Sequence, residues 1–365
     1  NNMALPKHVI EFAQGNTTLY EAMKDYYFHS LAEDGIEVHF NYDKSISLAE
    51  KDERMHKEFF KEVNRISTKP IPEDIKFEHW LGNKEFVWAT FTTVNTLIDA
   101  ILPDTLLKNI GLYTDLSIVG YGETRTFDIA PNSLLTTSDG SNARRTTFLQ
   151  KQFKGSKTLV PQNHAISVES SLYRMLCRKE SIAEFVKKAI ISLERDMLFN
   201  AYDALIALVE NGNFPAELTK AGYDKQKLLQ LCELVSAKNN GRPAIIAGTT
   251  SALARILPEA SEGYRMVMNA NNMSIQLIKS VFGYQTLVMP QVVTGNGYQL
   301  KLDDNKIFIL SPASDKIIKG VMEGTTFVTD VDYTDTANLT KSTTFNKRYT
   351  FEAVTNSTLG VIELG

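Results

Sequence analysis

The pattern in this sequence that comes closest to a ligand-binding motif is a short apolar run ending in glycine, Ala244-Ile-Ile-Ala-Gly248, followed by Thr-Thr-Ser. It predicts a buried strand that passes through Gly248 into a helix start, where free backbone amides could bind an anion. No Walker lysine follows, and no glycine triplet is present. Gly120-Tyr-Gly122 and Gly295-Asn-Gly297 also lack the third glycine of a dinucleotide-binding loop. The alternatives at Gly248 are therefore an anion site and a plain strand-to-helix turn.

Histidines and acidic residues are the next candidates for catalysis or metal binding. None of the six histidines is spaced from another, or from an acid, as a zinc or hydrolase motif requires. The six are His8, His29, His39, His56, His79 and His164. Asp330, Asp332 and Asp335 could present oxygens to a calcium ion or could form a solvated hairpin tip. No nucleophile elbow, Ser-x-x-Lys motif or Cys/His pairing appears, so the sequence predicts no catalytic residue, no metal and no cofactor.

A basic segment is the most specific feature of the sequence. No acidic residue occurs from Gly140 to Val168, although this stretch contains five cations. These candidate contact residues are Arg144, Arg145, Lys151, Lys154 and Lys157. They could contact phosphates, but only Phe148 and Phe153 are available to stack on bases. The pattern therefore favours a protein partner whose acids would face these cations.

Composition limits the class of protein. The chain has 365 residues, of which 43% are hydrophobic, with a formal net charge of -4 and two cysteines. The length predicts two or three domains, and two cysteines are too few for a disulfide framework, which favours a reducing compartment. We find no apolar run near the ~20 residues that span a bilayer, so we expect a soluble, unexported protein. The negative charge argues against a chain that coats nucleic acid.

The basic segment is expected to lie in a long β-hairpin. The sequence predicts strands over residues 116–122 and 124–129 and a return strand over 145–153. Between them, residues 136–142 are rich in turn-forming types. Few large apolar residues occur here, so the hairpin would gain little by folding onto itself.

One long helix is predicted over residues 181–211, where apolar residues recur at three- and four-residue spacing. Ser181 and Glu184 form a capping box, and Asn211-Gly212 suits the left-handed turn that ends a helix. Such a helix is roughly 45 Å long. Its apolar face widens after Met197, so its second half must be covered on more than one side.

Shorter elements precede and follow this helix. Amphipathic helices are predicted over residues 18–31 and 47–66, and their narrow apolar stripes need a partner surface to stay folded. Pro70-Ile-Pro72 ends this amino-terminal segment, and residues 84–102 then mix β-branched and aromatic types. Helices are predicted after the long helix over 225–237, 249–257 and 264–278, and β segments over 244–247, 284–293, 298–310, 316–328, 346–354 and 359–364. The fold class is therefore α+β.

In this order of elements the chain resembles the major capsid protein of tailed bacteriophages, which has the Hong Kong 97 fold. The residues that carry the resemblance are Leu116-Ser-Ile-Val-Gly-Tyr-Gly-Glu-Thr-Arg-Thr-Phe, Glu194-Arg-Asp-Met-Leu-Phe-Asn-Ala and Ala244-Ile-Ile-Ala-Gly-Thr. The resemblance implies an amino-terminal arm, an extended β-hairpin loop, a long spine helix, a peripheral β domain and an α/β axial domain. The implied division is an arm at 1–72, a peripheral part at 73–114, the hairpin loop at 115–165, the spine helix and peripheral domain at 166–224, the axial domain at 225–312, peripheral return strands at 313–355, and an axial carboxy-terminal strand at 356–365.

The resemblance also implies function and partners. The expected protein is structural rather than enzymatic, and it assembles through pentamers and hexamers into an icosahedral shell that encloses phage DNA without sequence-specific binding. Scaffolding, portal and decoration proteins are the implied partners, the virion capsid is the implied location after assembly in the host cytoplasm, and no membrane is involved. The arm is expected to lie across a neighbouring subunit. A start at Asn1 would fit proteolytic removal of an amino-terminal segment, and a longer chain fits it equally well. Some members of this family cross-link a hairpin lysine to a distant asparagine, but no motif here fixes such a pair, so that chemistry is not carried over to this chain.

Two alternatives remain open at this point. In the first, the chain is a shell-forming structural protein. Its five hairpin cations then face carboxylates across an inter-subunit contact, either those of Asp330, Asp332 and Asp335 or those of the arm. In the second, the chain is a cytosolic α/β enzyme with an anion-binding turn at Gly248.

Overall fold

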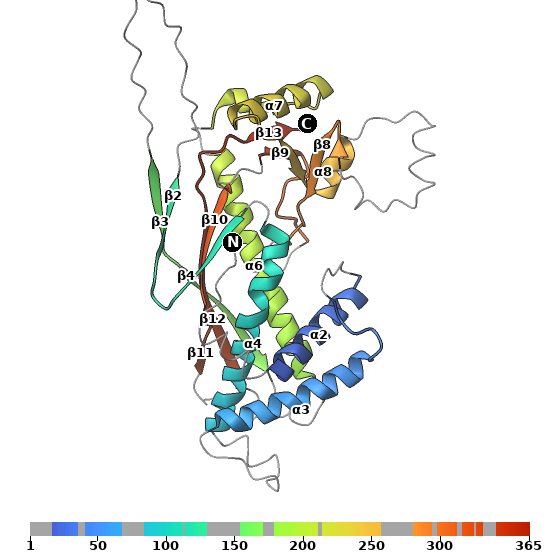
Figure 1. Cartoon of the computed structure of the whole chain (residues 1–365), viewed down its shortest axis with the longest axis vertical. Coiled ribbons are helices and arrows are strands. Elements are labelled where there is room, and N and C mark those ends of the chain that lie inside the picture. The colour runs from blue at the N-terminus through green and yellow to red at the C-terminus, as the bar shows by residue number, and fades with distance from the viewer. Residues whose placement is uncertain are drawn as a thin grey trace, which may run out of the picture.

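A computed structural model describes most of the chain and places helices and strands in both halves of it (Figure 1). The described residues are 17–35, 41–67, 84–111, 114–129, 154–170, 179–210, 214–256, 280–293, 298–311, 316–324, 326–330 and 341–365. Helices and sheets follow one another along the chain without a regular βαβ repeat. The predicted α+β class is confirmed.

The helix α6, Ile182–Glu210, is the element that contacts both large sheets. The predicted start is confirmed, because Ser181 caps the helix by accepting a hydrogen bond from the Glu184 amide at 3.2 Å. The helix is described as far as Glu210, and the predicted closing turn at Asn211-Gly212 lies outside the described residues. Phe185 near its start packs against Phe345 of one sheet, with ring centroids 6.0 Å apart. Near its other end, Tyr202 donates a hydrogen bond to the Pro290 carbonyl at 2.9 Å. The helix therefore joins the two sheets along its length.

The first sheet is centred on one long strand, β12. Its members are β1 (Thr114–Val119), β4 (Gln162–Ser170), β10 (Ile318–Glu323), β11 (Phe327–Asp330) and β12 (Lys341–Ala353). One edge of β12 pairs antiparallel with β10 and β11, the other edge pairs antiparallel with β4, and β10 pairs parallel with β1. Strands far apart in the sequence are thus brought together beside α6 (Figure 1).

The second sheet is mixed and carries the carboxy-terminal strand. Its order is β5 (Thr219–Ala221), β13 (Gly360–Glu363), β9 (Lys306–Leu310), β6 (Ile245–Gly248), β8 (Tyr284–Val288) and β7 (Ser280–Val281). Helix α7, Lys225–Lys238, packs on it and buries Leu228, Leu231 and Cys232 in a separate core. The short helix α8, Thr250–Arg255, follows β6 directly. The predicted elements at 225–237, 244–247, 249–257 and 359–364 are confirmed.

Two amino-terminal helices, α2 (Thr17–Glu33) and α3 (Leu48–Ile66), pack on the rest of the same chain. Met55, Phe59 and Val63 in the apolar stripe of α3 are fully buried, and Leu48 and Ile66 at its two ends are partly buried. Ser181 at the start of α6 donates a hydrogen bond to Asp52 of α3. The expectation of an arm that needs a neighbouring subunit differs from this finding for α2 and α3, because their partner surface lies within the chain.

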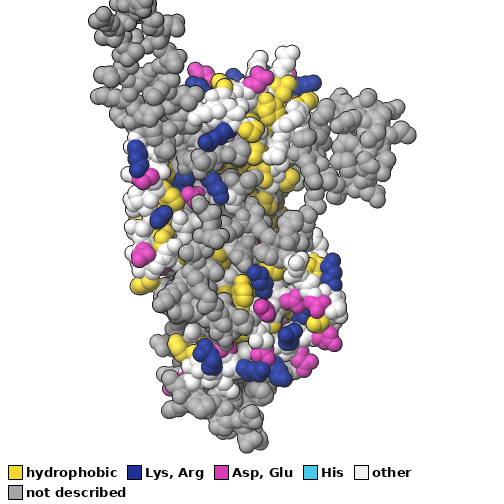
Figure 2. All heavy atoms as spheres, in the orientation of Figure 1, with side chains coloured by type: hydrophobic (Ala, Val, Ile, Leu, Met, Phe, Trp, Pro, Cys, Tyr) yellow, Lys and Arg dark blue, Asp and Glu magenta, His cyan; other side chains and the backbone are white. Residues whose placement is uncertain are grey.

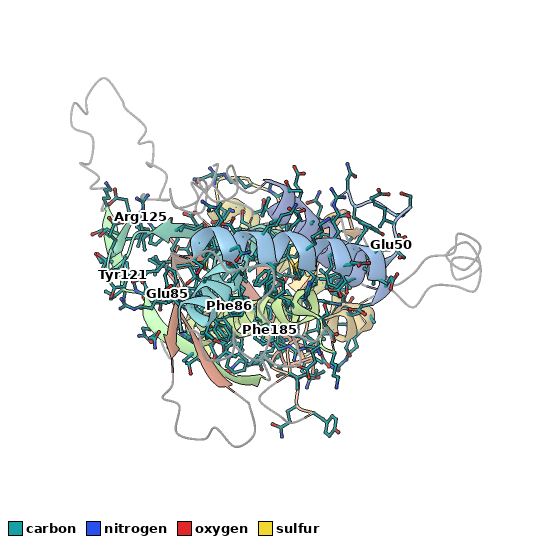
Figure 3. All side chains as sticks on the ribbon, turned by 90° about the horizontal axis from the view of Figure 1, so that it is seen from below. Glu50, Glu85, Phe86, Tyr121, Arg125 and Phe185 are labelled. Carbon is teal, nitrogen blue, oxygen red and sulfur yellow. The ribbon has the colours of Figure 1, made fainter. Side chains whose placement is uncertain are left out.

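The outer face of α3 is charged, as its sequence predicted. Figure 2 shows Lys, Arg, Asp and Glu side chains gathered over the part of the molecule where α2 and α3 lie. Ser47 and Glu50 form the capping box at the helix start, with both bonds present. Figure 3 places Glu50 at the outer end of the helix, while Phe86 and Phe185 lie inside.

Residues 84–102 form the start of a buried helix, α4, Lys84–Ile110. Its threonines satisfy their hydroxyl groups locally: Thr90 donates to the Phe86 carbonyl at 2.9 Å and Thr93 to the Ala89 carbonyl at 2.8 Å. Contrary to the prediction from the sequence, the span Glu85–Pro103 is long and apolar enough to cross a membrane by length and composition, but 83% of its most apolar stretch is buried inside the protein. It therefore has the burial expected of a core helix.

Other predicted elements are partly described. The predicted strand 298–310 is formed only at its end, as β9, with a single bridge between Val293 and Leu300 before it. The predicted segment 316–328 is split into β10 and β11. The predicted helix 264–278, the return strand 145–153 and the tip 136–142 lie outside the described residues.

Replacing Gly320 of β10 with alanine is expected to lower the free energy of unfolding by about 1 to 3 kcal/mol, because the core has no space for the added methyl group. A Cβ at this position would lie 2.6 Å from the Phe351 ring and 2.9 Å from Leu116. Urea unfolding monitored by circular dichroism measures the change. Gly155→Ala is the matched control, since its nearest neighbour would be Ile129 at an ordinary 3.5 Å. Equal stability of the two variants would contradict the packing at Gly320.

The two-stranded hairpin as a candidate interaction site

The site with the strongest case for contact with a partner is a two-stranded sheet at the edge of the body (Figure 1). It consists of β2, Arg125–Ile129, and β3, Gly155–Leu159, paired antiparallel. Thr126 and Thr158 lie opposite each other, and their hydroxyl oxygens are 2.8 Å apart. The predicted strand at 124–129 is confirmed as β2, but its described partner is β3 at 155–159 rather than a strand at 145–153. The predicted strand at 116–122 ends at Val119 as β1 and pairs with β10 of the first sheet, so its predicted place in the hairpin was wrong.

The two faces of this hairpin differ in burial. Phe127 and Leu159 point toward the body and are buried with Val119 and Val321 in a small apolar cluster. On the opposite face, every side chain of the paired strands is exposed. These are Thr126, Asp128, Ser156 and Thr158. The hairpin is thus held by one narrow face and presents a polar outer face to a partner.

The root of the hairpin, where its two legs leave the body, is held by a charged pair. Glu323, at the end of β10, is fully buried, and its Oε1 accepts from the Gly122 amide at 3.2 Å. Arg348 of β12 donates to the same Oε1 at 2.9 Å and to the Pro161 carbonyl at 3.0 Å. Figure 3 labels both Tyr121 and Arg125 at this edge of the molecule. Gly122 precedes β2 and Pro161 follows β3, so the pair reaches both legs.

Two of the five predicted contact cations lie at this hairpin and have acidic partners in the same chain. Lys154 Nζ lies 2.9 Å from Asp128 Oδ2, and Lys157 Nζ lies 3.0 Å from Glu352 Oε2. All four side chains are substantially exposed, so each pair contributes only about 0 to 1 kcal/mol. Sequence reasoning missed these partners because Asp128 lies across the hairpin and Glu352 follows far later in the chain.

The remaining predicted contact residues are not brought together in the described part of the chain. Arg144, Arg145 and Lys151 lie outside the described residues, as do Asp332 and Asp335. Asp330 ends β11, where it is paired in register with Thr343 of β12. The prediction that the hairpin cations face these acids in a neighbouring copy stays a prediction.

The alternative anion site at Gly248 has the expected local structure but unsuitable surroundings. Thr249 caps α8 by accepting from the Ala252 amide at 3.1 Å, and its hydroxyl donates to Asp304 at 2.6 Å. Gln291 donates to the same Asp304 oxygen at 3.0 Å. An anion at this turn would therefore face a carboxylate, and the helix has only six residues. The geometry favours a plain strand-to-helix turn.

Polar side chains also line an open depression of about 490 Å³ between α6, β4 and β12. His164 lies at its edge, with Nδ1 3.2 Å from Asp196 Oδ2 and its ring stacked on Tyr349 at 3.9 Å. Tyr349 donates a hydrogen bond to Asp196. Burial, and then this bond, raise the pKa of the Tyr349 phenol, so it stays protonated and ties β12 to α6. Sequence reasoning missed the cluster because no local spacing links its members.

Other groups with possible chemistry are explained by packing. Within the described ranges, no group of three or more His, Cys, Asp or Glu side chains could hold a metal ion. Burial raises the pKa of the Cys232 thiol to about 12, which keeps it protonated and a poor nucleophile. His29 stacks on Tyr42, and His56 packs against Phe60. His8, His39 and His79 lie outside the described residues.

Fold and site together define an α+β protein whose two sheets share one long helix and whose edge bears a two-stranded hairpin. No family model matches the chain, and no curated protein is similar to it. Among solved structures, the chain is similar to the capsid of an empty GTA particle at 11% identity, covering 70% of this chain and 89% of that one, with a TM-score of 0.47.

Two further solved structures give similar values. The mature capsid of bacteriophage PhiM1 is 11% identical over 69% of this chain and 85% of that chain, with a TM-score of 0.45. A virus-like particle from Pyrococcus furiosus is 10% identical over 73% of this chain and 97% of that chain, with a TM-score of 0.42.

Proposed function

We propose that the chain is a structural, non-enzymatic shell protein: the major capsid protein of a tailed phage, which assembles with copies of itself through pentamers and hexamers around DNA. The observation that carries the proposal is the hairpin, which is anchored by one narrow face and leaves its other face exposed. The Hong Kong 97-like arrangement of domains set out from the sequence is part of this proposal. It gives α6 the role of the spine helix and the second sheet that of the axial domain.

The energetics of the hairpin favour a partner. A two-stranded hairpin alone is marginally stable at best in water, and this one is anchored by the side chains of Phe127 and Leu159. The polar outer face adds little to stability while it faces water. Contact with another protein surface would bury that face and pair its backbone edges, which gives the exposed strands a physical reason to persist.

A second copy of the chain is the simplest such partner. Most soluble oligomers are built from identical subunits with closed symmetry, so a surface that one subunit leaves unused is covered by its neighbour. Arg144, Arg145 and Lys151 of the basic stretch add charge that a neighbour's acids would balance, whereas Lys154 and Lys157 already have acidic partners in this chain. Scaffolding, portal and decoration proteins belong to the proposal as further partners, and the virion is the proposed location.

The enzyme alternative receives less support. Its anion site would place a negative ligand beside Asp304, which already accepts from Thr249 and Gln291. A bound anion and the Asp304 carboxylate would repel each other, and this Coulomb repulsion is strong where water is partly excluded. We therefore propose that the turn at Gly248 is structural.

Purified protein is expected to form rings or closed shells. Size-exclusion chromatography with light scattering, followed by negative-stain microscopy over a range of protein concentration and salt, measures this directly. Closed particles with five- and six-fold subunit rings are the expected result. A monomer or dimer at every concentration would contradict the shell proposal, and saturable phosphate binding that protects Gly248 from hydrogen exchange would support the enzyme alternative instead.

A further inference from the structure

The two legs of the hairpin leave the body through short connections that differ in shape. The entering leg makes a tight turn in which the Glu123 amide donates to the Gly120 carbonyl at 3.2 Å. The Glu123 side chain accepts from the Gly120 amide at 2.8 Å. Gly122 has a φ of 71°, a conformation that glycine adopts without strain. The leaving leg passes through Pro161 into β4. Neither connection is part of a regular ladder, so other contacts must fix the hairpin's direction.

A single ion pair supplies such contacts to both legs. Glu323 Oε1 binds the amide of Gly122 on the entering leg, and Arg348 joins that carboxylate to the carbonyl of Pro161 on the leaving leg. The two residues sit on adjacent strands, β10 and β12, of the first sheet. Gly324 adds a backbone bond to Val119 at 3.1 Å beside the pair. A rigid sheet thus holds both legs through one pair of side chains.

We infer that Glu323 and Arg348 are positioning residues that fix the direction in which the hairpin leaves the body. The consequence, that they set where the hairpin meets a neighbouring copy, rests on the proposed function. Neither residue is one of the cations and acids predicted from the sequence to form the contact itself. Glu323 and Arg348 act on the hairpin's direction through their hydrogen bonds to the Gly122 amide and the Pro161 carbonyl.

The chemistry of the pair suits this role. The Glu323 side chain is 0% exposed. Within the described part of the chain its Oε2 has no hydrogen-bond partner, and Arg348 is the one cation that forms an ion pair with this buried carboxylate. The planar guanidinium donates in two directions at fixed geometry, which a lysine ammonium on a flexible stem does not reproduce. Lysine at position 348 would keep the charge but lose the simultaneous contact with both legs.

The hairpin has other contacts that would survive this change. Phe127 and Leu159 remain in their apolar cluster, and Lys319 Nζ lies 5.8 Å from the centre of the Phe127 ring. Lys157 remains paired with Glu352. Weakening the root pair should therefore loosen the hairpin's direction without detaching the hairpin from the body.

Distance measurement between two spin labels tests the inference on the unassembled full chain. Cysteines are introduced at exposed Ser156 of β3 and exposed Ser192 of α6, with Cys177 and Cys232 replaced by alanine. In the otherwise unchanged protein, pulsed dipolar spectroscopy should give one narrow distance distribution. Arg348→Lys should broaden and shift this distribution while circular dichroism and the thermal midpoint show a folded protein.

Arg65→Lys is the matched control, because Arg65 makes a comparable two-armed pair with Glu62 on α3, away from the hairpin. It should leave the distribution unchanged. Glu323→Gln, which keeps the amide-accepting oxygen but removes the charge, is the second variant, and its broadening should be smaller than that of Arg348→Lys. An unchanged distribution in Arg348→Lys, or in Glu323→Gln if the former does not fold, would overturn the inference.

The same variants separate this inference from the proposed function. If unsubstituted protein forms no shells but Arg348→Lys broadens the distribution, the shell proposal fails and the positioning role stands. If shells form normally from Arg348→Lys and the distribution is unchanged, the positioning role fails and the shell proposal stands.

Discussion

Replacing both Arg144 and Arg145 with glutamate is expected to abolish shell assembly, or to divert it to irregular particles, while the subunit remains folded. The two arginines lie in a stretch with no acidic residue, so within it their charge is uncompensated. In the proposed shell they face carboxylates of a neighbour, and reversal would turn attraction into repulsion at every copy of the contact. Each exposed pair contributes only about 0 to 1 kcal/mol, but the contact is repeated throughout a closed shell.

Salt is the diagnostic variable for this prediction. The defect should be largest at low ionic strength and should diminish as screening shortens the range of the repulsion, to about 8 Å at physiological salt. Turbidity, light scattering and negative-stain microscopy at several salt concentrations measure assembly, and circular dichroism confirms the fold.

A double reversal of exposed Arg54 and Lys57 on α3 changes the net charge equally and serves as the control. If the hairpin variant forms normal shells at low and moderate salt, the two arginines are simply exposed to solvent. Docking of the hairpin on a neighbouring subunit must then depend on backbone pairing or apolar contact.

Replacing Lys347 with methionine is expected to lower the free energy of unfolding by about 3 to 5 kcal/mol, which is the usual cost of leaving one partner of a buried ion pair without the other. Lys347 of β12 is 1% exposed and donates to Asp99 of α4 at 2.5 Å. Asp99 is 3% exposed and also accepts from the Thr326 amide at 2.8 Å. The variant would leave a charged carboxylate in the core between α4 and the first sheet.

Urea unfolding measures the loss, and two further variants assign it. Lys188→Met removes an exposed pair with Glu184 on α6 and should cost about 0 to 1 kcal/mol. Adding Asp99→Asn to Lys347→Met should recover part of the stability, because the amide still accepts from Thr326 and no buried charge remains. A Lys347→Met protein as stable as the Lys188→Met protein would show that the pair does not hold α4 on the sheet.

The elements that the sequence predicted best are those with local signals. The capping residues Ser181 and Ser47 marked the starts of α6 and α3, and the stripe of Met55, Phe59 and Val63 marked the buried side of α3. Periodicity gives the orientation of a helix but not the identity of the surface that covers it. For this reason the sequence assigned the cover of α3 to a neighbour, whereas the chain itself supplies it through α4 and α6.

The parts that the sequence missed depend on long-range contact. Residues 84–102 contain many β-branched types, and they form a helix because burial of its apolar side chains overrides local propensity. The bonds from Thr90 and Thr93 to carbonyls one turn earlier only satisfy their buried hydroxyl groups. Glu323 and Arg348 are charged residues in strands, with no motif around them. Only the pairing of β10 with β12 brings them to the root of the hairpin.

Because α6 is attached to both sheets, a small rotation of the helix at one sheet is amplified into a larger displacement at the other. Phe185 packs on one sheet near the start of the helix, and Glu210 at its end lies 2.9 Å from Lys306 of the other sheet. A stiff rod of 29 residues is about 44 Å long. Pivoting it by roughly 5° about its first turn therefore sweeps its last turn through about 4 Å, as the length and pitch of a helix dictate. A small tilt of α6 where it packs on the first sheet therefore becomes, at the second sheet, a displacement comparable to the width of a side chain.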